Sequence, residues 1–125
     1  MRILLDTNVL LWFIADDEKL EPDHRAMIEN TENKIIVSIV SLWEIAIKVK
    51  IGRLSLDVNF ETFLKIIKEQ YCFYILNISD SHLIQYIKLP LHHRDPFDRL
   101  IYSQAKVEDM IFLYTDDIFK LYEVA

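Results

Sequence analysis

The sequence Ile3-Leu4-Leu5-Asp6 places a carboxylate directly after three consecutive apolar residues. Similar continuous apolar runs occupy residues 35–37, 73–76 and 111–114. Short runs of this kind are typical of strands that are buried on both faces, as in a parallel sheet covered by helices. These four segments therefore predict a central, mostly parallel sheet.

Longer segments with helical patterns separate the apolar runs. They are residues 8–15, 22–30, 41–51, 60–69, 80–88 and 96–108. Strands that alternate with helices predict an α/β fold with right-handed crossovers. With 125 residues and no linker-like composition, the chain is expected to form a single domain over residues 1–125.

Three sites in the sequence mark the ends of helices. Asp95-Pro96 combines an N-cap residue with a proline at the first helical position. Ser41 and Glu44 have the spacing of a capping box, which predicts a second helix start. Gly52 follows a segment with two lysines, so it predicts the end of that helix.

The composition excludes several classes of site. Gly52 is the only glycine, so a glycine-rich loop that binds phosphates is ruled out. Cys72 is the only cysteine, which excludes an intrachain disulfide and a cysteine-rich zinc site. Acidic residues outnumber basic ones by 20 to 14, which argues against strong non-specific binding of nucleic acids. No apolar stretch is long enough to cross a membrane, so a cytoplasmic location is expected.

Four acidic positions that lie far apart in the sequence are expected to meet at one edge of the sheet. Asp6 follows the first predicted strand, and Asp116 or Asp117 follows the last. Glu44 lies in the first turn of a helix entered from a strand, and Asp98 opens the helix that leads into the last strand. Ligands of open α/β sheets bind outside the carboxyl ends of the strands, which is the edge that these acids share.

Converging carboxylates repel one another, so a bound cation is the simplest partner for them. Oxygen ligands alone suit Mg²⁺ or Mn²⁺ rather than zinc, and a metal-held water beside a phosphodiester would permit hydrolysis. Each acid also has a structural explanation. These are a capping box for Glu44, a first-turn charge for Asp98, a turn or N-cap for Asp6 and a cap of the final helix for Asp116 or Asp117.

Three segments carry a more specific pattern, namely residues 3–12 with Asp6-Thr7-Asn8, residues 37–48 with Glu44, and residues 93–105 with Asp98. In this order and spacing they resemble the PIN-domain ribonucleases, and among them the VapC-type toxins of bacterial toxin–antitoxin pairs. The resemblance implies a PIN-like three-layer α/β domain. It further implies an endoribonuclease that uses Mg²⁺ or Mn²⁺ on RNA, a homodimer, and a small antitoxin that keeps the enzyme inactive.

The resemblance also assigns roles to single residues. Asp6, Glu44 and Asp98 match the first, second and third metal-binding acids of the family. Asn8 matches a polar residue that helps to hold the first acid, and Ser41 matches a polar position beside the second. Two residues match the fourth acid of the family. The spacing of the family pattern selects Asp117 when it is counted from Thr115, and Asp116 when it is counted back from Phe119.

Several other side chains have two readings. Lys48, Arg94 and Arg99 are candidates for contacts with RNA phosphates, although Lys48 is also spaced for a helix ion pair with Glu44. Five aromatic residues are expected in the core rather than as platforms for bases, namely Trp12, Trp43, Phe63, Phe73 and Phe97. The high apolar fraction leaves a surplus that would suit a dimer face or an antitoxin groove.

Two other functions deserve comparison with the nuclease. A receiver-like signalling domain would match the length and the α/β pattern, with Asp57 as the phosphate acceptor, but Asp57 follows Gly52 in a predicted loop. A phosphatase with Asp6 as nucleophile is a third reading. Such sites usually have a second acid two residues further on, where this chain has Asn8.

Overall fold

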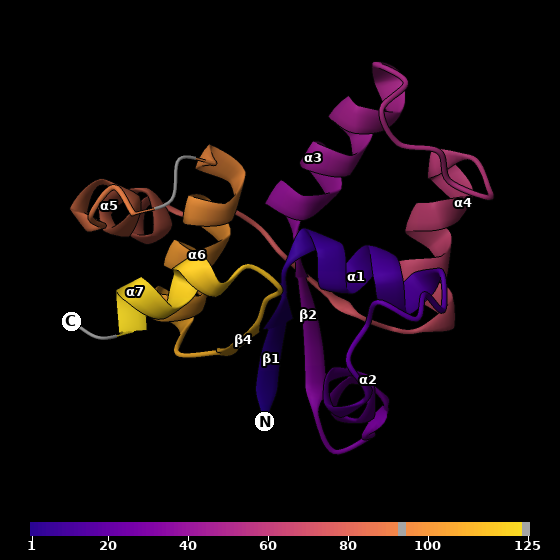
Figure 1. The fold of residues 1–125 in the computed structure, drawn as a ribbon, viewed down its shortest axis with the longest axis horizontal. Coiled ribbons are helices and arrows are strands. Elements are labelled where there is room, and N and C mark those ends of the chain that lie inside the picture. The colour runs from indigo at the N-terminus through magenta and orange to yellow at the C-terminus, as the bar shows by residue number, and fades with distance from the viewer. Residues whose placement is uncertain (93–94, 124–125) are drawn as a thin grey trace.

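The central sheet of this computed structural model, which describes residues 1–92 and 95–123, is parallel throughout. Its described strands are β1 (Arg2–Leu5), β2 (Lys34–Ser38), β3 (Tyr74–Leu76) and β4 (Ile111–Leu113). They lie in the order β3-β2-β1-β4, so β1 is an inner strand (Figure 1). The predicted parallel sheet is confirmed, and each strand lies at its predicted position to within a residue or two.

The helices also follow the predicted order. The described α-helices are α1 (Thr7–Ile14), α2 (Pro22–Glu29), α3 (Ile39–Lys50), α4 (Phe60–Lys65), α5 (Asp80–Lys88), α6 (Pro96–Glu108) and α7 (Lys120–Glu123). The predicted helix over residues 60–69 changes after α4 into a π-helical turn, Ile66–Gln70. A short 3₁₀ turn, Asp117–Phe119, precedes α7. No helix in the described ranges is long and apolar enough to span a membrane.

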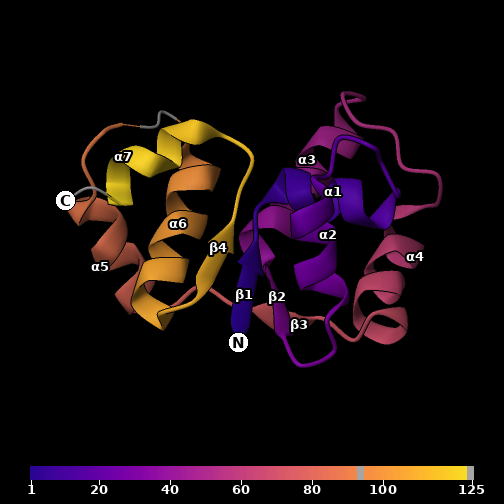
Figure 2. The same ribbon diagram turned by 60° about the horizontal axis from the view of Figure 1, so that its bottom comes forward.

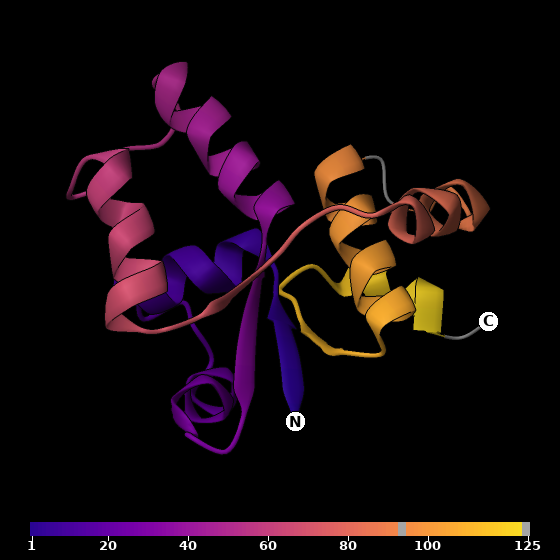
Figure 3. The same ribbon diagram turned by 180° about the vertical axis from the view of Figure 1, so that it is seen from behind.

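Helices cover both faces of the sheet and make three layers (Figure 2). Ile3 and Leu5 of β1 point into the larger core with α1, α3 and α4, whereas Leu4 points to the opposite face and packs near Ile101 and Ala105 of α6. The chain passes from one layer to the other after β3, along the connection to α5 (Figure 3). The alternation of side chains along a fully buried strand explains why its sequence is apolar at every position.

The start of α3 differs from the prediction. Ser38, at the end of β2, caps the helix by accepting a hydrogen bond from the Val40 amide at 3.0 Å, so the capping box predicted at Ser41 and Glu44 is wrong. The reason is that Ser38 is the first hydroxyl to reach the free amides of the new helix. Ser41 and Glu44 are thereby left inside the helix, and their side chains reach Thr7 at the start of α1.

The other predicted helix ends are confirmed. Asp95 Oδ1 accepts hydrogen bonds from the amides of Phe97 at 2.9 Å and Asp98 at 3.4 Å, so it caps α6. Gly52 follows α3 with a φ of +77°, a left-handed conformation that glycine adopts without strain.

The predicted burial of the aromatic residues holds in part. Phe63 and Phe73 are buried, whereas Trp12 and Phe97 are half-buried. Trp43 contradicts the prediction because 59% of its surface is exposed. The buried face of α3 is made by its neighbours on either side in sequence, which leaves Trp43 on the outer face, packed edge-to-face against Phe97.

Candidate active site

Acidic side chains from four elements line one cavity of about 120 Å³ at the carboxyl edge of the sheet. Asp6 comes from the end of β1, Glu44 from α3, Asp98 from the first turn of α6, and Asp116 from the segment after β4. The described lining also includes Thr7, Asn8, Lys48, Asp95 and Thr115. The fold therefore brings together the acids that the sequence analysis expected at one edge.

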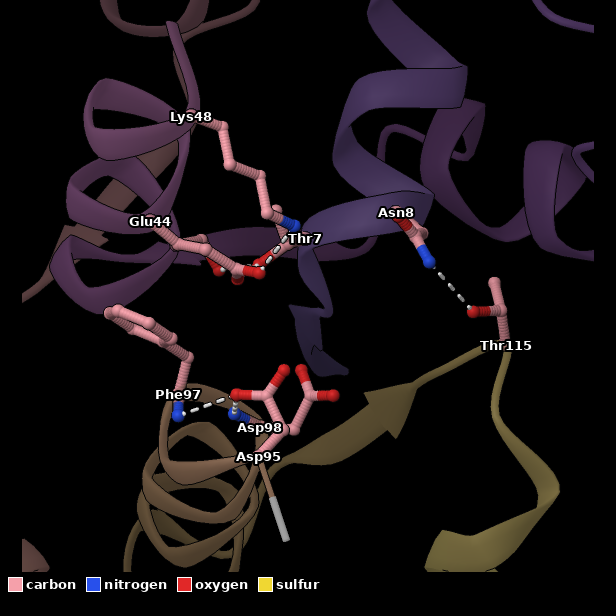
Figure 4. Close-up of polar contacts among 9 residues, drawn as sticks. Thr7, Asn8, Glu44, Lys48, Asp95, Phe97, Asp98 and Thr115 are labelled. Atoms are coloured by element: carbon pink, nitrogen blue, oxygen red, sulfur yellow. Dashed lines mark hydrogen bonds and ion pairs between the residues drawn. The ribbon is translucent and has the colours of Figure 1, made fainter. Parts of the chain in front are cut away.

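Asp6 is held rigidly at the N-terminus of α1. One carboxylate oxygen accepts a hydrogen bond from the Val9 amide at 2.7 Å, and the other accepts from the Thr115 amide at 2.9 Å. Burial outweighs these bonds and raises the pKa of Asp6 to about 6. Asn8 donates to Thr115 Oγ1 at 3.4 Å (Figure 4), so Thr115, rather than Asn8, makes the observed contact with Asp6.

Glu44 is buried and is contacted on both carboxylate oxygens. Oε1 accepts a hydrogen bond from Thr7 Oγ1 at 2.7 Å, and Oε2 forms an ion pair with Lys48 Nζ at 2.9 Å (Figure 4). Thr7 Oγ1 also lies 3.1 Å from Ser41 Oγ. Ser41 therefore reaches Glu44 through Thr7, a residue to which the sequence analysis gave no role.

Asp98 lies across the cavity from Glu44, beside Asp95 (Figure 4). Burial raises the pKa of Asp98 to about 7, and the negative charges of Asp95, Glu44, Asp6 and Asp116 add to this effect. Asp95 was predicted only as a helix cap. In the folded chain it caps α6 and also contributes its charge to the cavity, because the cap lies at the same edge of the sheet.

The two candidates for the fourth acid lie in different surroundings. Asp116 lines the cavity mouth and accepts a hydrogen bond from the Ile118 amide at 3.0 Å. Asp117 is exposed and pairs with Lys120 Nζ at 3.3 Å, and it is absent from the described lining of the cavity. The geometry therefore favours Asp116 as the fourth acid.

The three basic residues proposed to contact RNA also separate. Lys48 lines the cavity. Arg99 does not fit the prediction, because it is buried between α6 and α5, where its guanidinium stacks over Tyr86 and donates to the Leu89 carbonyl at 3.3 Å. A guanidinium with these structural contacts is not available at the surface. Arg94 lies outside the described residues.

The donor set of the cavity fits a hydrated divalent cation. Its acidic ligands are carboxylate oxygens, and the raised pKa values of Asp6 and Asp98 show that the site disfavours further negative charge. Within the described residues, no three histidine, cysteine or acidic side chains form a ready-made metal cluster. Mg²⁺ commonly keeps several waters and takes only one or two carboxylates. A cavity of about 120 Å³ has room for several waters, which suits such an ion.

Comparison with known proteins agrees with the fold. One similar structure is a chain of VapBC2 from Rickettsia felis bound to a DNA fragment from their promoter, with 19% identity, a TM-score of 0.71 and coverage of 98% of this chain and 93% of that one. Another is a chain of FitAcB from Neisseria gonorrhoeae, with 19% identity, a TM-score of 0.64 and coverage of 98% and 94%. Curated proteins yield no match.

The sequence motifs and the fold can now be joined to a family. The model of the PIN domain family matches residues 3–124, which is nearly the whole chain. The matched region includes every acid in the described lining of the cavity and all of the described strands except Arg2, the first residue of β1. As its motifs predict, the chain belongs to the PIN domain family.

Proposed function

We propose that this chain is an endoribonuclease that depends on Mg²⁺ or Mn²⁺ and hydrolyses RNA phosphodiester bonds as a single domain over residues 1–125. The observation that carries this proposal is the cavity in which Asp6, Glu44, Asp98 and Asp116 meet from four separate elements. Membership of the PIN domain family supports the same activity. Carboxylates gathered at the carboxyl edge of a parallel sheet are suited to binding a cation and a phosphate together.

The residues of the cavity would have different roles in the reaction. Asp6 and Asp98 would hold the cation, because burial makes them the two carboxylates that gain most from a positive charge. Asp116, at the mouth, would orient water or the cation from the side of β4. When bound, the ion supplies a water of lowered pKa and offsets the negative charge of the phosphate in the transition state. Lys48, which pairs with Glu44 at 2.9 Å, would hold that carboxylate in place at the rim.

We further propose that the chain is the toxin of a toxin–antitoxin pair, acting in the cytoplasm as a homodimer. The fold likeness to chains of VapBC2 and FitAcB supports this assignment. Exposed apolar side chains on and after α5 support association with protein partners, since Leu83, Ile84, Ile87 and Leu91 lie close together in sequence and face solvent.

The two other functions find less support. Asp57 is exposed in the segment between α3 and α4, away from the carboxyl end of a strand, so a receiver-like acceptor site is not formed there. Asp6 as a phosphatase nucleophile is also disfavoured, because the position two residues further on, where such sites usually have a second acid, is Asn8, which donates to Thr115 Oγ1 at 3.4 Å.

The test is cleavage of single-stranded RNA by the purified chain. Mg²⁺ should support cleavage, and a chelator or the substitution Asp6→Asn should abolish it. Asp117→Asn is the matched control, because Asp117 is an exposed acid that pairs with Lys120. Cleavage by Asp6→Asn at the rate of the unchanged chain would overturn the proposal.

A further inference from the structure

Lys48 and Glu44 form an ion pair inside the cavity rather than on an open helix face. Pairs of Glu and Lys four residues apart are common on exposed helices, where both side chains remain in water. Here the Glu44 side chain is only 6% exposed, whereas that of Lys48 is 44% exposed. The lysine therefore reaches back from the rim to place its ammonium on a buried carboxylate.

The Glu44 carboxylate already has a donor on each oxygen. Thr7 donates to Oε1 at 2.7 Å, and the Lys48 ammonium lies 2.9 Å from Oε2. Thr7 brings no charge, so Lys48 supplies the positive charge at this wall of the cavity. A divalent ion at Glu44 would lie close to this ammonium and would be repelled by it.

The opposite wall of the cavity is acidic. Asp98 and Asp95 lie there, separated from Glu44 and Lys48 by the open cavity (Figure 4). Lys48 is the only basic residue in the described lining of the cavity, so a divalent ion is repelled less on the side of Asp98 and Asp95 than beside Glu44.

We propose that the Lys48 ammonium takes the place of a second divalent ion at Glu44, so that the chain binds one ion, on the side of Asp6 and Asp98. This inference rests on the proposed metal-dependent activity and specifies how many ions the site takes. Lys48 is then a positioning residue, which holds Glu44 in place and keeps another cation away from it.

The experiment counts Mn²⁺ ions bound to the metal-free chain, from the electron paramagnetic resonance signal of free Mn²⁺. The unchanged chain should bind one ion. Lys48→Met leaves Glu44 charged without its ammonium, so it should bind a second ion, and Lys48→Gln should do the same. Adding Glu44→Gln to Lys48→Met should return the count to one and so assign the second ion to Glu44.

Lys50→Met is the matched control, because Lys50 is an exposed lysine on the same helix that lies outside the described lining of the cavity. It should leave the count at one. Thermal melting of each variant verifies that it is folded before titration. A purely structural role for Lys48 would lower the melting temperature without changing the count.

The outcomes separate this inference from the proposed function. Two ions on the unchanged chain, or one ion on folded Lys48→Met and Lys48→Gln, would overturn the role of Lys48 and leave the metal-dependent nuclease standing. An unchanged chain that binds no Mn²⁺ would overturn the metal site and the inference with it.

Discussion

Two polar clusters flank the central sheet, and they differ in the charges that they bring together: one is the acid cavity at the carboxyl edge, and the other lies between α5 and α6. The second cluster is a hydrogen-bond network in which donors are matched by acceptors, and its members are Ser38, His82, Gln104 and Glu108. His82 Nδ1 accepts from the Ser79 amide at 3.0 Å, and Nε2 lies 2.8 Å from Glu108 Oε2. Gln104 accepts from the Ser38 hydroxyl and donates to the Asn77 carbonyl at 3.2 Å.

The acid cavity, by contrast, gathers groups of one sign. Burial and the surrounding carboxylates raise the pKa of Asp98 to about 7, and burial raises that of Asp6 to about 6. A network of matched donors and acceptors stabilises a fold, whereas a cluster of desolvated carboxylates lowers its stability and gains from a bound cation. The difference distinguishes a structural cluster from a functional one.

The largest expected effect is on activity, from a change in the cavity. Asp98→Asn should reduce RNA cleavage at least about 1000-fold, because it removes a ligand of the proposed ion. The same change should leave the melting temperature of the metal-free protein at pH 8 unchanged or higher, since it removes a buried charge. A cleavage assay and thermal melting test both parts. If Asp98→Asn were less stable but fully active, Asp98 would have a structural role instead of a functional one.

A change in the network should have the opposite result. Gln104→Leu keeps a similar volume but removes the acceptor of the Ser38 hydroxyl and the observed donor to the Asn77 carbonyl. Urea unfolding should show a loss of about 2–3 kcal/mol in the free energy of unfolding. Cleavage per folded molecule should stay within about twofold of the unchanged chain. A catalytic loss without a loss of stability would place the network in the active site.

The pH dependence of stability should come from the cavity. The folded-state pKa values of about 6 for Asp6 and about 7 for Asp98 exceed the ordinary value of 3.8, so the folded chain binds more protons than the unfolded chain between these limits. The free energy of unfolding therefore falls as the pH rises through this window.

We expect the metal-free chain to lose up to about 5 kcal/mol from pH 4.5 to pH 7.5, relative to the Asp6→Asn/Asp98→Asn double variant. Urea unfolding at a series of pH values measures this difference. Mg²⁺ should restore stability at the upper end, because it binds the ionised carboxylates. Parallel pH profiles for the two proteins would show that these carboxyls are not the source.

The smallest effect should separate the two neighbouring acids after β4. Asp116→Asn should reduce cleavage about tenfold, because Asp116 lines the cavity, whereas Asp117→Asn should change it less than about twofold. Initial rates on one RNA substrate suffice for this comparison. A larger loss of activity in Asp117→Asn than in Asp116→Asn would instead identify Asp117, in the 3₁₀ turn, as the fourth acid.

The sheet and the principal acids were predictable because their signals are local. Leu4 and its neighbours form an unbroken apolar run, which indicates a strand covered on both sides, and Asp6 ends that run. Asp95-Pro96 likewise marks a helix start within a few residues. The edge at which these elements end follows from the parallel topology.

The supporting contacts were not predictable in the same way. Thr7 binds Glu44 across 37 positions, and Thr115 binds Asp6 across 109, so neither pair has a spacing that marks it. Hydroxyl and amide groups of this kind serve equally well at caps and turns. Arg99 was misassigned for a related reason, since a basic residue beside an acidic motif has the same sequence whether it faces RNA or packs under a helix.

The bond between Asp6 and the Thr115 amide has a consequence for synthesis of the chain. It joins two residues that are 109 positions apart in the sequence, and β1 itself pairs with β4. A nascent chain that has not yet released β4 therefore lacks one wall of the cavity and one support of its first acid. The complete cavity would then form only after β4 has been released and has paired with β1.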